Sequence, residues 1–191
     1  RKELIEPLFG EVDKMIVGGN MVPAFLKARG HNVGDSVVPE EAVQFARDLD
    51  NAAEGRGVDV ILPRDVVCSR DGPGSAAAYG HAASFPDYVS SPEYGSKGPG
   101  PSSMVVPSSE IPAGAKFVDV GPLALRENAR ALDPCRTVVW SGPMGDYKNP
   151  PHNAGSRDTA ACLARHIDRH APMVMVVGDD TKEAVQGSPL M

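Results

Sequence analysis

The chain has 191 residues, 41% of them hydrophobic, which is enough for the core of one substantial domain. A formal net charge of −6 and the lack of any basic run argue against a nucleic-acid-binding surface. No apolar stretch is long enough for a transmembrane segment, and no signal peptide is predicted. Three cysteines without a C-x-x-C pair favour free thiols in a reducing compartment, cytoplasmic or plastid, and argue against a disulfide framework or a zinc site.

The first part of the chain alternates short β-branched stretches with longer amphipathic ones. A strand is predicted at 15–17, followed by the turn Gly18-Gly19-Asn20 and a helix over 21–29. A second helix is predicted to begin at Pro39, and a second strand follows at 58–62. Strands that alternate with helices favour parallel pairing with right-handed crossovers.

The stretch 68–103 differs in kind from the rest. It is rich in Gly, Pro and Ser and has no sustained hydrophobic period. We interpret it as a long surface excursion within one domain that spans residues 1–191, rather than as a linker between two domains.

The remaining part returns to the alternating pattern. Strands are predicted at 104–107, 116–120, 137–140 and 173–177, and helices at 123–132, at 158–170 and from Lys182. The stretch from Thr137 to Trp140 is typical of a strand buried on both faces. The whole pattern predicts an α/β fold with a doubly wound, mostly parallel sheet, a Rossmann-like three-layer lobe.

Four predicted strands end in glycine, at Gly18, Gly121, Gly142 and Gly178. In a parallel sheet these ends meet at one edge, where open α/β sheets bind their ligands. Glycine turns before helices suit phosphates, although the first turn alone is equally well explained as a tight strand–helix connection. The segment 179–181, Asp-Asp-Thr, is either a Mg²⁺ site on nucleotide phosphates or a helix N-cap.

Two histidines, His166 and His170, have the i, i+4 spacing of helical metal ligands. No Glu-rich pattern accompanies them. A solvated helix face is the preferred interpretation, because cations near a helix C-terminus suit its dipole.

Several motifs occur together in one order: V-G-G-N-M-V-P-A-F-L-K-A-R-G, V-D-V-G-P, T-V-V-W-S-G-P-M-G and V-V-G-D-D-T. With I-L-P-R-D-V-V at 61–67 and V-V-P-S-S-E-I-P-A-G at 105–114, the sequence resembles the C-terminal, nucleotide-binding lobe of phosphoglycerate kinase. The resemblance covers nearly the whole chain apart from 68–103. It implies a lobe that binds ATP or ADP with Mg²⁺ and works with an N-terminal lobe that holds 3-phosphoglycerate, or with other protein subunits.

The resemblance also implies which residues contact the cofactor, with Asp180 near the metal ion and Thr181 near the phosphates. The implied nucleotide-contacting residues are Gly18, Gly19, Asn20, Gly121, Ser141, Gly142, Pro143, Gly178, Asp180 and Thr181. No residue is assigned a catalytic role.

The sequence departs from the family pattern at several of these turns. Asn20 replaces a glycine, Ser141 replaces an asparagine, and Lys148 replaces the glutamate that holds the ribose. Val177 and Asp179 alter the phosphate turn, and two like charges ~4 Å apart repel by roughly 4 kcal/mol at an effective dielectric of 20. These departures predict a phosphoglycerate-kinase-like domain with a degenerate site, inactive on its own. The alternatives are a non-catalytic structural or scaffolding module and, third, a domain that binds another metabolite.

Overall fold

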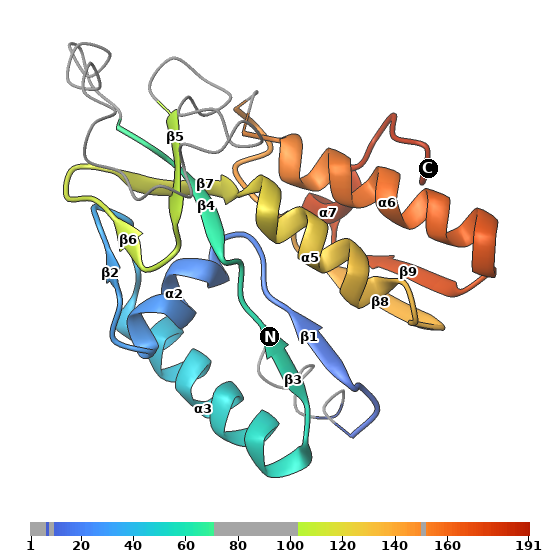
Figure 1. Ribbon diagram of the computed structural model, residues 1–191, viewed down its shortest axis with the longest axis horizontal. Coiled ribbons are helices and arrows are strands. Elements are labelled where there is room, and N and C mark those ends of the chain that lie inside the picture. Colours follow the sequence, from blue (N-terminus) through green and yellow to red (C-terminus); the bar gives the residue numbers. More distant parts are fainter. Residues whose placement is uncertain (1–6, 8–9, 71–102, 150–151) are drawn as a thin grey trace.

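The computed structural model describes residue 7 and residues 10–70, 103–149 and 152–191. These residues form an α/β lobe in which helices pack against short open sheets (Figure 1). The elements are β1 (Lys14–Ile16), α2 (Met21–Ala28), β2 (Asn32–Val33), α3 (Glu40–Arg56), β3 (Asp59–Ile61), β4 (Asp65–Ser69), β5 (Ser103–Pro107), β6 (Glu110–Ile111), β7 (Lys116–Val120), α5 (Pro122–Leu132), β8 (Thr137–Ser141), α6 (Ala154–His170), β9 (Met173–Val177) and α7 (Asp179–Ala184). None of the helices in the described part of the chain is both long and apolar enough to cross a membrane.

Parallel pairs dominate the strand topology. β1 pairs with β3, β2 with β6, and β8 with β9, all in parallel. The predicted α/β class with mostly parallel strands is therefore confirmed. The exception is a three-stranded sheet in which β4 lies between β5 and β7 and is antiparallel to both.

The strand β4 was not predicted, because the sequence interpretation ended the preceding strand at Pro63 and began the excursion at Cys68. All five residues of β4 are buried. Ser69 pairs with Ser103, so the ends of the predicted 68–103 excursion belong to two paired strands. The interior of that excursion, 71–102, lies outside the described residues.

Helix α3 shows how spacing and caps define an element. Its buried residues Val43, Ala46, Leu49 and Ala53 recur every three or four positions and therefore form one face, which packs on α2. The helix ends at Gly57, whose left-handed conformation (φ 69°) closes the last turn.

Strand β8 corrects the expectation that this segment is buried on both faces. Its side chains alternate, with Val138 and Trp140 buried and the residues between them exposed. Together with outward residues of β9, the exposed side forms an apolar strip of Val139, Met173, Met175 and Val177, each 40–61% exposed. The parallel pair of β8 and β9 therefore has one face against the core and one face exposed to solvent.

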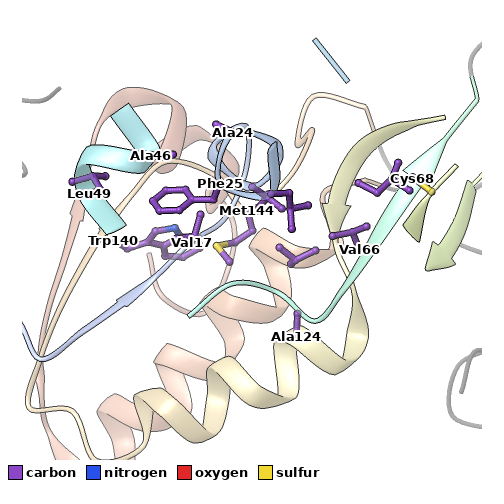
Figure 2. Close-up of a cluster of buried hydrophobic side chains, with 14 of the residues drawn as sticks. Val17, Ala24, Phe25, Ala46, Leu49, Val66, Cys68, Ala124, Trp140 and Met144 are labelled. Atoms are coloured by element: carbon purple, nitrogen blue, oxygen red, sulfur yellow. The ribbon is translucent and has the colours of Figure 1, made fainter. Parts of the chain in front are cut away.

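One hydrophobic cluster joins the two sides of the lobe (Figure 2). Val17 directly follows β1 and Phe25 lies on α2, whereas Trp140 and Met144 come from β8 and the turn that follows it. The Trp140 indole N–H also donates to the Gly142 carbonyl at 2.7 Å. The core therefore reaches directly to the turns at the ends of β1 and β8.

Candidate functional site

The turn after β1 packs directly against the turn after β8. The Gly19 N–H donates to the Met144 carbonyl at 2.8 Å, and Gly19 has a φ of +60°. A Cβ atom at Gly18 would overlap the Met144 side chain, and one at Gly19 would overlap the Pro143 carbonyl. Gly19 is thus required by its backbone contact and by its positive φ, whereas a Cβ at Gly18 would meet chiefly the flexible end of the Met144 side chain. The close packing at Gly19 supports the tight-connection interpretation that the sequence left open. Asn20 follows them, exposed and without a side-chain capping bond.

Thr181 ties together the turns after β8 and β9. Its hydroxyl accepts from the Gly142 N–H and donates to the Val177 carbonyl, both at 2.7 Å, and its side chain is 1% exposed. Because this hydroxyl is already used as donor and acceptor inside the protein, it acts here as a link between turns.

Backbone at the same edge remains open to a ligand. Gly142 has a φ of +99°, and no atom lies within 4 Å of the place where its Cβ would be. Gly178 has a φ of +92° and begins α7, while Ser141 is exposed at the end of β8. A flat group can therefore approach the main chain closely at Gly142, whereas a Cβ at Gly178 would lie in contact with the Thr181 hydroxyl at 3.5 Å.

Three carboxylates, Asp179, Asp180 and Glu183, lie on α7, directly after the β9 turn. Asp179 and Asp180 are exposed in the first turn of α7. The Tyr147 hydroxyl lies 2.7 Å from Glu183 Oε2 and 3.3 Å from Asp180 Oδ1. Desolvation and these two neighbours raise the pKa of Tyr147, so the phenol keeps its proton. The Lys148 ammonium lies 5.5 Å from the Tyr147 ring centroid. Asp180 is therefore part of an acidic group of three carboxylates.

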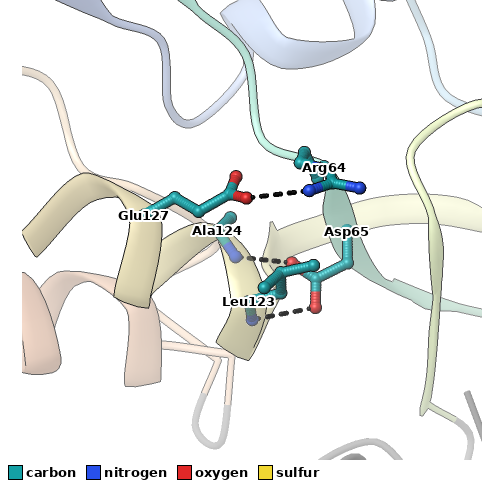
Figure 3. Close-up of polar contacts among 5 residues, drawn as sticks. All are labelled: Arg64, Asp65, Leu123, Ala124 and Glu127. Carbon is teal, nitrogen blue, oxygen red and sulfur yellow. Dashed lines mark hydrogen bonds and ion pairs between the residues drawn. The ribbon is translucent and has the colours of Figure 1, made fainter. Parts of the chain in front are cut away.

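Gly121 belongs to a neighbouring turn that Asp65 holds in place. Figure 3 shows the Asp65 side chain at the N–H groups of Leu123 and Ala124. The Asp65 carboxylate accepts from the N–H groups of Leu123 and Ala124 at 3.0 and 2.7 Å, and its carbonyl accepts from the Gly121 N–H. Asp65 is fully buried, and this desolvation raises its pKa although the two N–H donors oppose the shift. The first N–H groups of α5 are thus satisfied within the protein and do not face a ligand.

Asp119 caps the start of α6 in the same way that Asp65 caps the start of α5. It is 1% exposed and accepts from the N–H groups of Val120 and Gly155 at 2.8 and 2.7 Å. Burial raises the pKa of Asp119 to about 7. The nearby Ser156 hydroxyl accepts from the Met144 N–H at 2.9 Å. These contacts start α6 at Ala154, four residues before the predicted position, and fix the turn after β8.

Neither Asp65 nor Asp119 was predicted as a site residue. The available signal was an acidic residue inside a β-branched run, in P-R-D-V-V and V-D-V-G-P. A carboxylate inside an apolar strand is buried and therefore needs hydrogen-bond donors, and the backbone N–H groups of the turns provide them.

The structure brings together the predicted residues of the β1, β8 and β9 turns through the bonds of Gly19 and Thr181. Gly121 lies in the adjoining turn with Asp65. Binding of a nucleotide or of Mg²⁺ by these residues stays a prediction.

Known proteins resemble this chain over nearly its whole length. Residues 2–190 match the family model described as phosphoglycerate kinase. A phosphoglycerate kinase of Chloroflexus aurantiacus is 34% identical over 187 residues, which are 98% of this chain and 40% of that protein. A cytosolic phosphoglycerate kinase of Nicotiana tabacum is 33% identical over 183 residues, which are 96% of this chain and 39% of that protein.

Solved structures agree with the sequence matches. Phosphoglycerate kinase from Coxiella burnetii superposes with a TM-score of 0.74 at 25% identity, over 98% of this chain and 41% of the other. The enzyme from Pyrococcus horikoshii, at 13% identity and a TM-score of 0.62, shares the fold over 99% of this chain and 47% of its own. The chain thus spans about 40% of the length of the curated relatives it matches.

Proposed function

Since the chain belongs to the phosphoglycerate kinase family, we propose that it is the ATP- or ADP-binding lobe of such a protein, with a weakened nucleotide site. Transfer of phosphate between ATP and 3-phosphoglycerate is the activity that the family resemblance implies for the whole enzyme. This chain spans about 40% of its relatives. In the proposal it supplies the nucleotide side of that reaction, is inactive on its own, and depends on an N-terminal lobe or another subunit for the acceptor side.

The residues at the edge fit a magnesium ion better than they fit a phosphate group. The exposed carboxylate of Asp180 is the kind of ligand that Mg²⁺ prefers. Open backbone at Gly142 allows a nucleotide to lie close to the main chain. Bound Mg²⁺ would supply charge neutralisation for the phosphates. The Thr181 hydroxyl is less suited to bind a phosphate, because it already bonds to the turns after β8 and β9.

The observation that carries the proposal of weak binding is the acidic group beside the β9 turn. Asp179, Asp180 and Glu183 are all exposed within five residues of α7, and the Tyr147 hydroxyl contacts two of them. An arriving phosphate meets several like charges, and because the site is at the surface, water and salt reduce this repulsion. Lys148 adds a positive charge near Tyr147, at the position where the family pattern has a glutamate.

Calorimetric titration with ADP in excess Mg²⁺ tests the proposal. We expect the wild-type chain to bind with a dissociation constant in the millimolar range. Asp179→Asn removes one charge at constant shape, and we expect it to bind about fivefold tighter, which corresponds to about 1 kcal/mol. The matched control is Asp168→Asn, which removes an exposed aspartate on α6 and should leave the affinity unchanged.

Two results would contradict the proposal. Micromolar binding by the wild-type chain would show that the site is intact. Equal affinities of the wild type and Asp179→Asn would show that this charge does not weaken it.

A non-catalytic structural module is the second candidate. The apolar strip of Val139, Met173, Met175 and Val177 favours it, because contiguous exposed apolar surface is typical of interaction surfaces. If the chain is such a module, we expect no heat of nucleotide binding in the calorimetric titration of either the wild type or Asp179→Asn. Any saturable binding that Asp179→Asn strengthens would remove it.

A further inference from the structure

The C-terminal ends of α5 and α6 bring two histidines and an aspartate together. Asp133 follows the last residue of α5, while His166 and His170 lie on successive turns of α6. One donor atom from each of the three lies within 4.8 Å of the other two. The two helices lie side by side (Figure 1), so the cluster depends on their packing. His166 is roughly 16 Å along the α6 axis from Gly155, so the cluster is remote from the glycine turns.

The sequence predicted that His166 lies on a solvated helix face, and this prediction is wrong, because the residue is buried. It is 5% exposed, and its Nε2 lies 2.8 Å from the Cys135 carbonyl. Its Nδ1 is buried and has no hydrogen-bond partner among the described residues. A metal-binding imidazole typically donates from one nitrogen to a carbonyl or carboxylate and offers a lone pair on the other. The contact with the Cys135 carbonyl holds the His166 ring in one orientation and leaves Nδ1 as the nitrogen without a partner among the described residues.

The other two groups can adjust to a metal ion. His170 Nε2 and Asp133 Oδ1 are 3.7 Å apart, and their side chains are 50% and 66% exposed. Two ligand atoms of a tetrahedral Zn²⁺ with bonds of about 2.0 Å are separated by about 3.3 Å. A small rotation of exposed side chains is therefore enough to reach ligand spacing.

The position also suits a cation electrostatically. Asp133 is the C-cap of α5, and His170 is the last residue of α6. Carbonyl groups at the ends of two helices give a partial negative charge, which stabilises a cation nearby.

We propose that Asp133, His166 and His170 form a binding site for Zn²⁺ or a similar divalent transition metal, with water completing the coordination. Two imidazoles and one carboxylate are ligands that Zn²⁺ accepts, whereas Mg²⁺ prefers oxygen ligands alone. The site is independent of the proposed nucleotide edge. A bound ion would clamp the end of α5 to the end of α6, so its expected role is structural.

Titration with ZnCl₂ at pH 7.5 in a non-chelating buffer, with excess Mg²⁺ present, tests the site. We expect one Zn²⁺ per chain at micromolar affinity. His170→Ala and Asp133→Asn alter exposed side chains and should each weaken binding by about tenfold or more. His31→Ala, another exposed histidine, is the matched control and should not change the affinity.

Two further measurements separate this site from adventitious binding to thiols. Zn²⁺ should raise the Tm of the wild type and of His31→Ala but not that of His170→Ala. Co²⁺ bound at the site should show no thiolate-to-metal charge-transfer band, since Cys135 and Cys162 are not ligands in the proposal. Unchanged affinity in His170→Ala, a thiolate spectrum, or no binding by the wild type would each overturn it.

Discussion

At the scale of single residues, the lobe is organised by two enclosed carboxylates. Asp65 and Asp119 are at most 1% exposed, and each holds backbone N–H groups at the start of a helix. A charged group that leaves water loses its hydration, and donors recover part of that loss. These aspartates set the shapes of the turns around the candidate site without contacting a ligand.

Asp119 leads to a pH prediction. Its pKa is about 7 in the folded chain, mainly because of burial, and near 3.8 when unfolded. Between pH 4 and 7 the folded state therefore holds a proton that the unfolded state releases. The contribution of Asp119 to the free energy of unfolding is greatest at about pH 4. It falls by up to about 1.4 kcal/mol per pH unit as the pH rises, and it no longer changes above about pH 7.

Urea unfolding of the wild type and Asp119→Asn at several pH values from 4 to 8 measures this effect. Asn loses one acceptor oxygen, which lowers the free energy of unfolding by an amount that does not depend on pH. We expect the difference between wild type and variant to shrink as the pH rises from 4 to 7. A constant difference over that range would mean that Asp119 is already ionised in the folded protein.

At the scale of elements, α5 is a helix whose start is capped from another strand. It begins with Gly121-Pro122 and has no capping side chain of its own. The cap comes from Asp65 on β4, which is distant in sequence (Figure 3). The nearby ion pair between Arg64 and Glu127, at 3.1 Å, lies at the surface.

Asp65→Ala should therefore destabilise the lobe strongly. It leaves the buried N–H groups of Leu123 and Ala124 without an acceptor, which costs about 2–4 kcal/mol in the free energy of unfolding. Glu127→Gln is the matched control, because it removes only the exposed ion pair and should cost less than about 1 kcal/mol. Chemical denaturation measures both changes. Equal costs for the two variants would show that the cap is not what Asp65 contributes.

At the scale of the whole molecule, one core connects the two sides of the lobe. Met144 fills the space against Gly18, and Trp140 lies in the same cluster as Val17 and Phe25. A shared core couples the unfolding of the elements that it joins. The prediction of one domain over residues 1–191 depends on this coupling.

Trp140, the single tryptophan of the chain, can report on this cooperativity. We expect urea unfolding followed by Trp140 fluorescence and by far-ultraviolet circular dichroism to have the same midpoint. Met144→Ala should lower both midpoints equally, because removing a buried methionine costs about 2–5 kcal/mol. Separate transitions for the two probes would show that the sides of the lobe unfold independently.

Local pattern was sufficient for much of the fold. The helices 21–28 and 40–56, the strands 116–120, 137–141 and 173–177, and the α/β class follow from the period of apolar residues and from Gly and Pro at the ends. Motif order identified the family, because each motif is contiguous in sequence. The sequence also predicted that the glycines after four strands, Gly18, Gly121, Gly142 and Gly178, meet at one ligand-binding edge, and binding there stays a prediction.

Other features depend on residues that meet only in the folded chain. β4 was missed because its strand character comes from pairing with β5 and β7, beyond a long Gly- and Pro-rich segment. The bond from the Gly142 N–H to the Thr181 hydroxyl and the capping by Asp65 involve partners far away in sequence. His166 and His170 lacked an acidic partner nearby in the sequence because Asp133 lies just after the end of another helix, α5. Sequence alone determined most of the elements and the family, because these depend on contiguous pattern, whereas tertiary contacts decided the pairing of β4 and which polar groups are already satisfied.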